Sequence, residues 1–328
     1  MLKDSFGREI NNLRISVTDR CNFRCVYCMP AHGMEWLDKN KILTFEEIYR
    51  LTKIFSELGV TKLRLTGGEP LLRKELNVLV EMLSSIEAIE DISLTTNGYF
   101  LKEQAQMLLD SGLKRINISL DSLKNDAFST ITRRSYYEKV RRGIDKAAQI
   151  GLSPIKINVV LIRGFNDNEI LDFAELSRKN NFVIRFIEFM PIGNDDKRNM
   201  EKVVSSEEII STIEHGLGIN LLPKSKRGTQ PADTFMFEDG MGEIGFISSV
   251  SQPFCEHCNR VRITSDGKLR ACLFSVGEID LRKLLREGAQ GQEIKDLIIE
   301  AIWEKESGHL INKPGFIRPA RTMSQIGG

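Results

Sequence analysis

Short β-rich runs alternate with longer amphipathic stretches over the first two-thirds of the 328-residue chain. This alternation is typical of βα units, which build a parallel sheet. Thr44, with Glu47 three residues later, predicts the start of one intervening helix, and Gly59 predicts its end. The chain holds six such units, with strands expected to begin at Leu13, Lys62, Asp91, Arg115, Ile155 and Val183.

Every second position of the first five strands is polar, which is unusual for a parallel sheet covered by helices on both faces. The polar positions are Arg14, Ser16, Thr18, Lys62, Arg64, Thr66, Ser93, Thr95, Asn97, Arg115, Asn117, Ser119, Asp121, Lys156 and Asn158. If the apolar positions pack on helices, the polar ones face a shared interior. The sequence predicts an α/β fold: an incomplete (βα)6 barrel of the TIM type, with chemistry at the carboxyl ends of the strands. The alternative is an open sheet with a solvated polar face. The sixth strand alternates less clearly, and its facing is not predicted.

The pattern changes after about Pro191 to charged loops, hairpins and terminal helices. Two hairpins are expected, over 234–250 and 259–274, the second with a turn at Asp266 and Gly267. We therefore expect a barrel domain over 1–190. We also expect a C-terminal region over 191–328 that closes the open side of the barrel.

The charge balance narrows the choice of partners and location. The chain has 46 basic and 45 acidic residues, a formal net charge of +1, which argues against a nucleic-acid or membrane-surface protein. No run approaches the roughly 20 apolar residues of a membrane span, and residues 1–12 lack a signal-peptide core. A cytoplasmic location is expected, where six cysteines favour metal or redox chemistry over disulfides.

All six cysteines fall in two triplets. The first is C-x3-C-x2-C and the second is C-x2-C-x13-C; their members are Cys21, Cys25 and Cys28, then Cys255, Cys258 and Cys272. A structural zinc site closes with four ligands. Three thiolates on a 4Fe-4S cubane instead leave one iron free to bind another molecule. His32 or His257 could complete a zinc site, so both metals stay open on spacing alone.

The segment CNFRCVYC resembles the signature of the radical S-adenosylmethionine superfamily. The resemblance implies a 4Fe-4S cluster on the first triplet, whose open iron binds S-adenosylmethionine and yields a 5'-deoxyadenosyl radical. It also implies four cofactor contacts: Tyr27, Gly68 of the TGGEP segment, Ser119 and Met190.

Basic residues within expected strands indicate an anionic ligand. Arg14, Arg64 and Lys156 occupy polar strand positions, and Arg260 and Arg262 lie beside the second triplet. A desolvated guanidinium requires an anion or a strong acceptor, and arginine binds phosphate in a bidentate manner. A locally basic cleft in a neutral chain therefore predicts a small polyanion such as a nucleoside triphosphate.

The two triplets, the NRVRI segment and the terminal MSQIGG together resemble the GTP 3',8-cyclase family over nearly the whole chain. The resemblance implies a lyase that converts GTP to (8S)-3',8-cyclo-7,8-dihydroguanosine 5'-triphosphate, the first step of molybdopterin (molybdenum cofactor) biosynthesis. It implies a second 4Fe-4S cluster, which meets the guanine, on the second triplet. The implied GTP contacts are Arg14, Arg64, Thr95, Lys156, Arg260, Val261 and Arg262. The implied catalytic residues are Arg260, Arg262, Gly327 and Gly328, with the diglycine reaching into the active site.

The resemblance further implies a homodimer, and the chemistry needs an electron donor that the sequence does not identify. No nucleic-acid or membrane partner is expected. Two other functions remain open: a radical enzyme with an auxiliary cluster that modifies a peptide, and a zinc-stabilised binding module without catalysis.

Overall fold

The structure is a computed structural model that describes residues 1–190, 199–224, 228–311 and 316–327. Within these ranges, one 12-stranded sheet has the order β12-β11-β10-β1-β2-β3-β4-β5-β6-β9-β8-β7. The six predicted strands are confirmed as its parallel centre: β1 (Asn12–Ser16), β2 (Lys62–Thr66), β3 (Asp91–Thr96), β4 (Arg115–Ser119), β5 (Ile155–Leu161) and β6 (Val183–Glu188).

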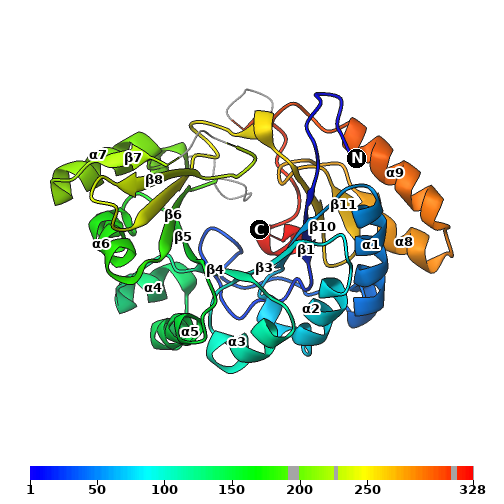
Figure 1. Cartoon of the computed structure of the whole chain (residues 1–328), viewed down its shortest axis with the longest axis horizontal. Helices are drawn as coiled ribbons and strands as arrows, with labels where there is room; N and C mark the ends of the chain where they lie inside the picture. The colour runs from blue at the N-terminus through cyan, green and yellow to red at the C-terminus, as the bar shows by residue number, and fades with distance from the viewer. Residues whose placement is uncertain (191–198, 225–227, 312–315, 328) are drawn as a thin grey trace.

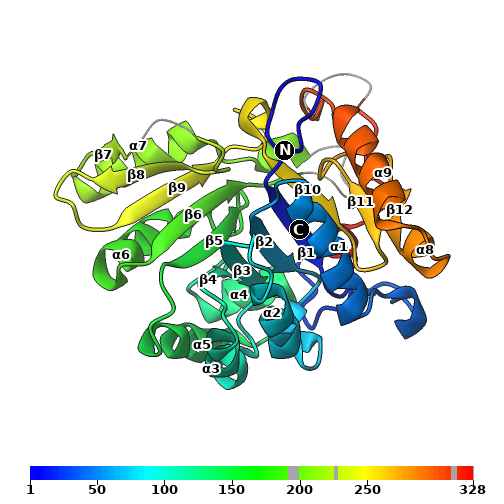
Figure 2. The same ribbon diagram turned by 45° about the vertical axis from the view of Figure 1, so that its right-hand side comes forward.

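Both predicted hairpins are confirmed, and each one lengthens the sheet at one edge. Their strands are β8 (Asp233–Phe237) with β9 (Glu243–Ile247), and β10 (Arg260–Ile263) with β11 (Lys268–Arg270). β9 runs parallel to β6 and β10 parallel to β1. The outermost strands are β7 (Leu221–Pro223) and β12 (Ile279–Asp280). The order does not join them, so the described sheet is a curved, incomplete barrel (Figure 2).

Helices that follow the central strands cover the outer, convex side of the sheet (Figure 1). They are α1 (Phe45–Glu57), α2 (Leu76–Ser84), α3 (Leu101–Asp110), α4 (Asn125–Thr132), α5 (Tyr137–Gln149) and α6 (Ile170–Asn180). The C-terminal region adds α7 (Ser206–Leu217), α8 (Leu281–Arg286), α9 (Gly291–Trp303) and α10 (Met323–Ile326). Figure 1 shows α10 in the hollow of the sheet. In the described part of the chain, no helix has the length and apolar character needed to cross a bilayer.

The alternation of the strands decides which face is the core. Leu13, Leu63 and Val261, at neighbouring register positions of β1, β2 and β10, are at most 1% exposed and belong to the hydrophobic core. Side chains one position along the strand point to the opposite face. The polar face therefore lines the concave side, and the solvated open sheet is not the structure adopted.

Helix α1 forms as its sequence predicts. The Thr44 hydroxyl accepts a hydrogen bond from the Glu47 amide while the Glu47 carboxylate accepts one from the Thr44 amide, a complete capping box. One residue past the C-cap Leu58, Gly59 has a φ of +101°, a left-handed conformation that favours glycine. Ile48, Leu51 and Phe55 then form one apolar face that packs on the sheet.

A glycine-mediated contact between α5 and the segment before α3 gives a test of this packing. A Cβ on Gly143 of α5 would lie 2.5 Å from the Gly98 carbonyl oxygen. We expect Gly143→Ala to lower the free energy of unfolding by about 1 to 3 kcal/mol, because the helix must move away. Gly291→Ala is the matched control, since no atom lies within 4 Å of its Cβ position. Equal urea denaturation midpoints for the two variants would contradict the packing described.

Candidate active site

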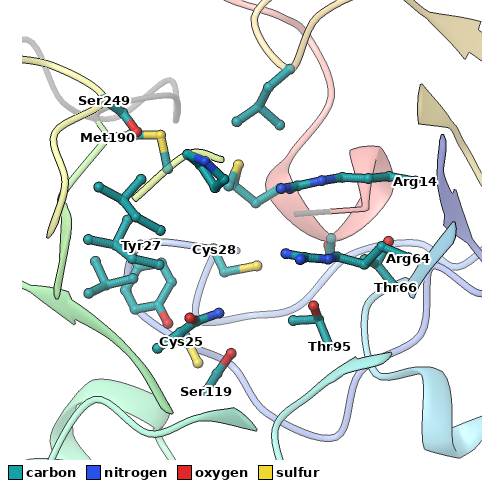
Figure 3. A pocket seen from close by; sticks show the side chains of 18 of the residues that line it. Arg14, Cys25, Tyr27, Cys28, Arg64, Thr66, Thr95, Ser119, Met190 and Ser249 are labelled. Atoms are coloured by element: carbon teal, nitrogen blue, oxygen red, sulfur yellow. The ribbon is translucent and has the colours of Figure 1, made fainter. Parts of the chain in front are cut away.

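A cavity of about 270 Å³ lies on the concave side of the sheet, at the carboxyl ends of the parallel strands. Both cysteine triplets line it, and so do polar residues from β1 to β5. Figure 3 shows Arg14 and Arg64 extending into this cavity from the side opposite Tyr27 and Met190. The fold thus brings the two ends of the chain to one site.

The first triplet lies in the loop after β1, and the TGGEP segment after β2 holds this loop in place. The Gly68 amide donates to the Thr18 carbonyl at 2.7 Å, and the Glu69 amide donates to the Arg20 carbonyl at 2.7 Å. A Cβ on Gly68 would lie 2.4 Å from the Arg20 carbonyl oxygen. The close approach of the two loops therefore requires glycine at this position.

Tyr27 joins the cysteine loop to the ends of β4 and β5. Its hydroxyl donates to Asp121 Oδ2 at 2.6 Å, and Asp121 Oδ1 accepts a hydrogen bond from the Val160 amide at 2.9 Å. Burial raises the pKa of Asp121 to about 6. Asp121 was among the polar strand positions, but its bond to Tyr27 could not be read from the sequence.

The thiols of the first triplet are held as neutral groups unless a cation joins them. Burial, together with Glu69 and Cys28, raises the pKa of Cys21 to about 12. Burial also raises the pKa of Cys28 to about 11. Because metal ligation requires thiolates, the positive charge of bound iron offsets this cost. Three half-buried thiols at a cavity wall fit the donor set of a 4Fe-4S cluster.

The second triplet is on the hairpin of β10 and β11. Cys255 and Cys258 precede β10, and Cys272 follows β11. Burial acts to raise the pKa of Cys258, but the charges of Arg260 and Lys305 outweigh it and lower the pKa to about 6. Arg260 Nη2 also donates to Cys258 Sγ at 3.4 Å. This electropositive setting favours a thiolate and so also fits a cluster.

Neither histidine considered as a fourth zinc ligand lines the cavity; His32 and His257 are both exposed. Within the ranges that the structure covers, no three Cys, His, Asp or Glu residues are grouped so as to hold a single metal ion. A cubane does not need such a grouping, because each thiolate binds a different iron.

Arginine side chains from three strands, Arg14, Arg64 and Arg185, line one side of the cavity, here called the arginine floor. The sheet register places Arg14 of β1 between Arg64 of β2 and Arg262 of β10. Burial and the neighbouring Arg262 and Arg64 hold the pKa of Arg14 well below its usual value, and burial with Arg185 lowers that of Arg64 to about 9. Nε of Arg14, Arg64 and Arg185 is buried without a hydrogen-bond partner among the described residues. Like charges side by side destabilise a sheet, so this face is arranged for an anion.

Arg185 is a cavity-lining residue that the sequence did not predict. It is 4% exposed, lines the cavity, and lies opposite Asn158 in the register of β5 and β6. Polar and apolar residues do not alternate clearly in β6, so the sequence did not show which face of the sheet Arg185 occupies. The polar position of Asn158 on the adjacent strand would have predicted it, had the strand register been known. His309 and Ser249 also line the cavity without any sequence signal.

Most of the residues implied by resemblance line the cavity. They are Tyr27, Gly68, Ser119 and Met190 for the cofactor and Arg14, Arg64, Thr95, Arg260 and Arg262 for GTP, besides the six cysteines. Two do not. Lys156 lies on the same face of β5 two residues before Asn158, where burial and Arg185 lower its pKa to about 7. The Val261 side chain is 0% exposed in the core, so only its backbone could reach a ligand.

The tail reaches the wall of the cavity. Arg262 Nη1 donates to the Gly327 carbonyl at 2.7 Å. Gly327 has a φ of +81°, and a Cβ there would lie 2.7 Å from Thr66 Oγ1 and 2.8 Å from Ser16 Cβ. Only glycine fits this position. Gly328 lies outside the described residues.

Comparison with known proteins agrees with this site. Residues 15–177 match the Radical SAM superfamily, and residues 182–311 match the family described as Molybdenum Cofactor Synthesis C. The GTP 3',8-cyclase of Thermodesulfovibrio yellowstonii is 47% identical over 328 residues, which is 100% of both chains. The chain belongs to the GTP 3',8-cyclase family. The GTP 3',8-cyclase of Moorella thermoacetica is likewise 47% identical, over 327 residues and 100% of both chains. Membership in this family brings two 4Fe-4S clusters and S-adenosylmethionine as cofactors.

Solved structures share the fold at low sequence identity. SuiB of Streptococcus suis, bound to its precursor peptide SuiA, has a TM-score of 0.63 at 12% identity, covering 95% of this chain and 75% of its own. The protein anSMEcpe with bound AdoMet has a TM-score of 0.60 at 14% identity, covering 97% and 88%. These likenesses confirm the incomplete barrel that the strand pattern predicts.

Gly68, where the loop after β2 contacts the cysteine loop after β1, offers a test of how the first triplet is positioned in this member of the GTP 3',8-cyclase family. We expect Gly68→Ala to push the first cysteine loop away and to reduce bound iron from about eight to about four per chain after reconstitution. Gly277→Ala is the control, because nothing lies within 4 Å of its Cβ position. A full iron content in the Gly68→Ala protein would show that this contact does not shape the loop.

Proposed function

We propose that this chain performs GTP 3',8-cyclisation, the first step of molybdenum cofactor biosynthesis, inside the cavity that both cysteine triplets line. One observation carries this proposal. Arg14, Arg64 and Arg185 line the same cavity as both sets of three thiols, and the Nε atom of each is buried without a hydrogen-bond partner among the described residues. The cavity thus matches two open clusters with a polyanionic substrate between them.

The first triplet and the strand ends bind the cofactor in this proposal. Cys21, Cys25 and Cys28 hold the first cluster. When bound, this cluster and S-adenosylmethionine supply the radical that removes hydrogen from the ribose C3' of GTP. The cofactor is contacted by Tyr27, Gly68, Ser119 and Met190. Asp121 keeps Tyr27 in position through the 2.6 Å hydrogen bond.

The triphosphate binds on the floor of basic side chains. Arg14 and Arg64 offer guanidinium groups whose Nε atoms have no hydrogen-bond partner among the described residues, and Arg185 adds a third. Thr95 supplies a hydroxyl from β3. Lys156 supplies a positive charge from β5, two residues before Asn158 on the concave face of the sheet. Phosphate oxygens relieve the repulsion between these groups, so binding energy comes from charges already held in place.

The second triplet and the tail hold the guanosine end. Cys255, Cys258 and Cys272 would hold the second cluster, which would supply an iron without a protein ligand for the guanine base. Arg260, the Val261 backbone and Arg262 line the base site, and the diglycine of Gly327 and Gly328 approaches the substrate. The bond from Arg262 to the Gly327 carbonyl orients both groups.

We propose a functional division into a barrel over 1–190 and a C-terminal region over 191–328, which contributes the second triplet and the tail. An external one-electron donor is required, and two chains form a homodimer.

A peptide-modifying radical enzyme is the competing function, because SuiB, which shares the fold, is bound to a precursor peptide. The unpaired arginines favour a triphosphate instead. We expect the anaerobically reconstituted protein to hold about eight irons and eight sulfides per chain and to release 5'-deoxyadenosine with GTP and S-adenosylmethionine. Release supported only by a peptide would overturn the proposal. About two zincs without iron would instead identify a binding module.

Substitution of Arg185 alone tests whether the arginine floor binds the triphosphate. We expect Arg185→Gln to weaken GTP binding by about tenfold to a hundredfold, because one charge-assisted hydrogen bond to phosphate is lost. Cleavage of S-adenosylmethionine by the first cluster should be retained. Arg141→Gln is the control, since Arg141 pairs with Glu138 at the surface. Binding of guanosine, which lacks phosphate, should not change; an equal loss for guanosine would remove Arg185 from the phosphate site.

A further inference from the structure

A buried lysine contacts the backbone beside the second triplet without lining the cavity. Lys305 follows the C-cap of α9 and is only 3% exposed. Its ammonium group donates to the Arg260 carbonyl at 3.0 Å and to the Ala271 carbonyl. It does not line the cavity, and no sequence pattern singled it out.

The two acceptors are the backbone groups that carry the cysteines. Arg260 begins β10 two residues after Cys258, and Ala271 directly precedes Cys272. One ammonium group therefore bridges the two strands of the hairpin at the point where each meets a thiol. The position of this group helps to set the separation of two of the three ligands.

The charge of Lys305 has no protein counter-ion in the described chain. It forms no ion pair with a carboxylate there, and two of its three N–H donors are used by neutral carbonyls. A buried, unpaired ammonium ion is costly. The thiols of Cys258 and Cys272 can supply a counter-charge, because Cys258 lies two residues before Arg260 and Cys272 directly follows Ala271.

The segment around Lys305 is fastened to the same loop by a second cation. Arg8 is paired with Asp4, and it donates to the Cys255 carbonyl at 2.8 Å and to the Ser307 carbonyl at 2.8 Å. A Cβ on Gly308 would lie 3.3 Å from Cys255 Cβ. These contacts hold the chain that directly follows Lys305 against the loop of Cys255.

We propose that Lys305 is a positioning residue whose ammonium group is the fixed counter-charge of the second cluster. The inference rests on the proposed function only in taking the second triplet as a cluster site. The anionic cluster offsets the cost of burying the ammonium ion, and the ammonium ion in turn favours the more reduced, more negative state of the cluster.

Unfolding of the protein with and without iron separates a counter-charge from a simple hydrogen-bond donor. Lys305→Gln keeps an N–H donor and removes the charge, whereas Lys305→Arg keeps the charge. We expect Lys305→Gln to lower the denaturation midpoint more in the reconstituted protein than in the iron-free protein, and Lys305→Arg to show little such difference. Equal losses in both forms would overturn the proposal. Lys295→Gln, on α9 but paired with Glu57, is the control.

Electron paramagnetic resonance titration gives a second readout that does not depend on turnover. We expect the midpoint potential of the second cluster to shift to more negative values in Lys305→Gln, or its iron to be lost while the first cluster keeps about four irons. Lys305→Arg should restore most of the effect. Full iron content and an unchanged second potential would contradict the inference. Failure of the unmodified protein to bind a second cluster would instead overturn the proposed function.

Discussion

The parallel pairing of β10 with β1 is the constraint on which the rest of the site depends. β1 leads directly into the first cysteine loop, and β10 directly follows Cys255 and Cys258 and pairs with β11, which precedes Cys272. Their register sets Arg14 beside Arg262 and leaves Leu13 beside Val261 in the core. A shift of one residue would turn the arginines toward the helices and bury charge in an apolar layer. Packing of the hydrophobic face therefore fixes the strand register, and this register holds the arginines in place on the opposite face.

The cavity accumulates groups that are unfavourable in the absence of ligands. The positive charges of Arg14 and its arginine neighbours repel one another. Burial opposes ionisation of the thiols in the first triplet, as the raised pKa of Cys21 shows. The core, with helices on the convex side, holds these groups in place. Iron, a polyanion and the tail then supply the missing charges and hydrogen bonds. The geometry is consequently prepared for binding before any ligand arrives, which reduces the reorganisation that catalysis requires.

Much of the fold and site could be predicted from residue patterns. The alternation of polar and apolar positions predicted the barrel and the facing of five strands, and the cysteine spacing with the CNFRCVYC and NRVRI segments predicted the chemistry. Arg185 could not be predicted because β6 has no clear period, and its facing is set by pairing with Asn158. Lys156 and Val261 were predicted as GTP contacts, but neither side chain lines the cavity. Lys156 lies too early along β5, and the Val261 side chain points into the core.

The sequence by itself determined the local features: the strands and helices, the capping of α1, and three thiols in each of two short segments. These features depend on neighbours within a few residues, so they can be predicted from residue composition and spacing. Only the tertiary structure decided that both triplets share one cavity, that Arg262 holds Gly327, and that Lys305 bridges the hairpin beneath Cys258 and Cys272. Such contacts arise from strand order and register, which are set by the packing of the whole core and not by any one segment.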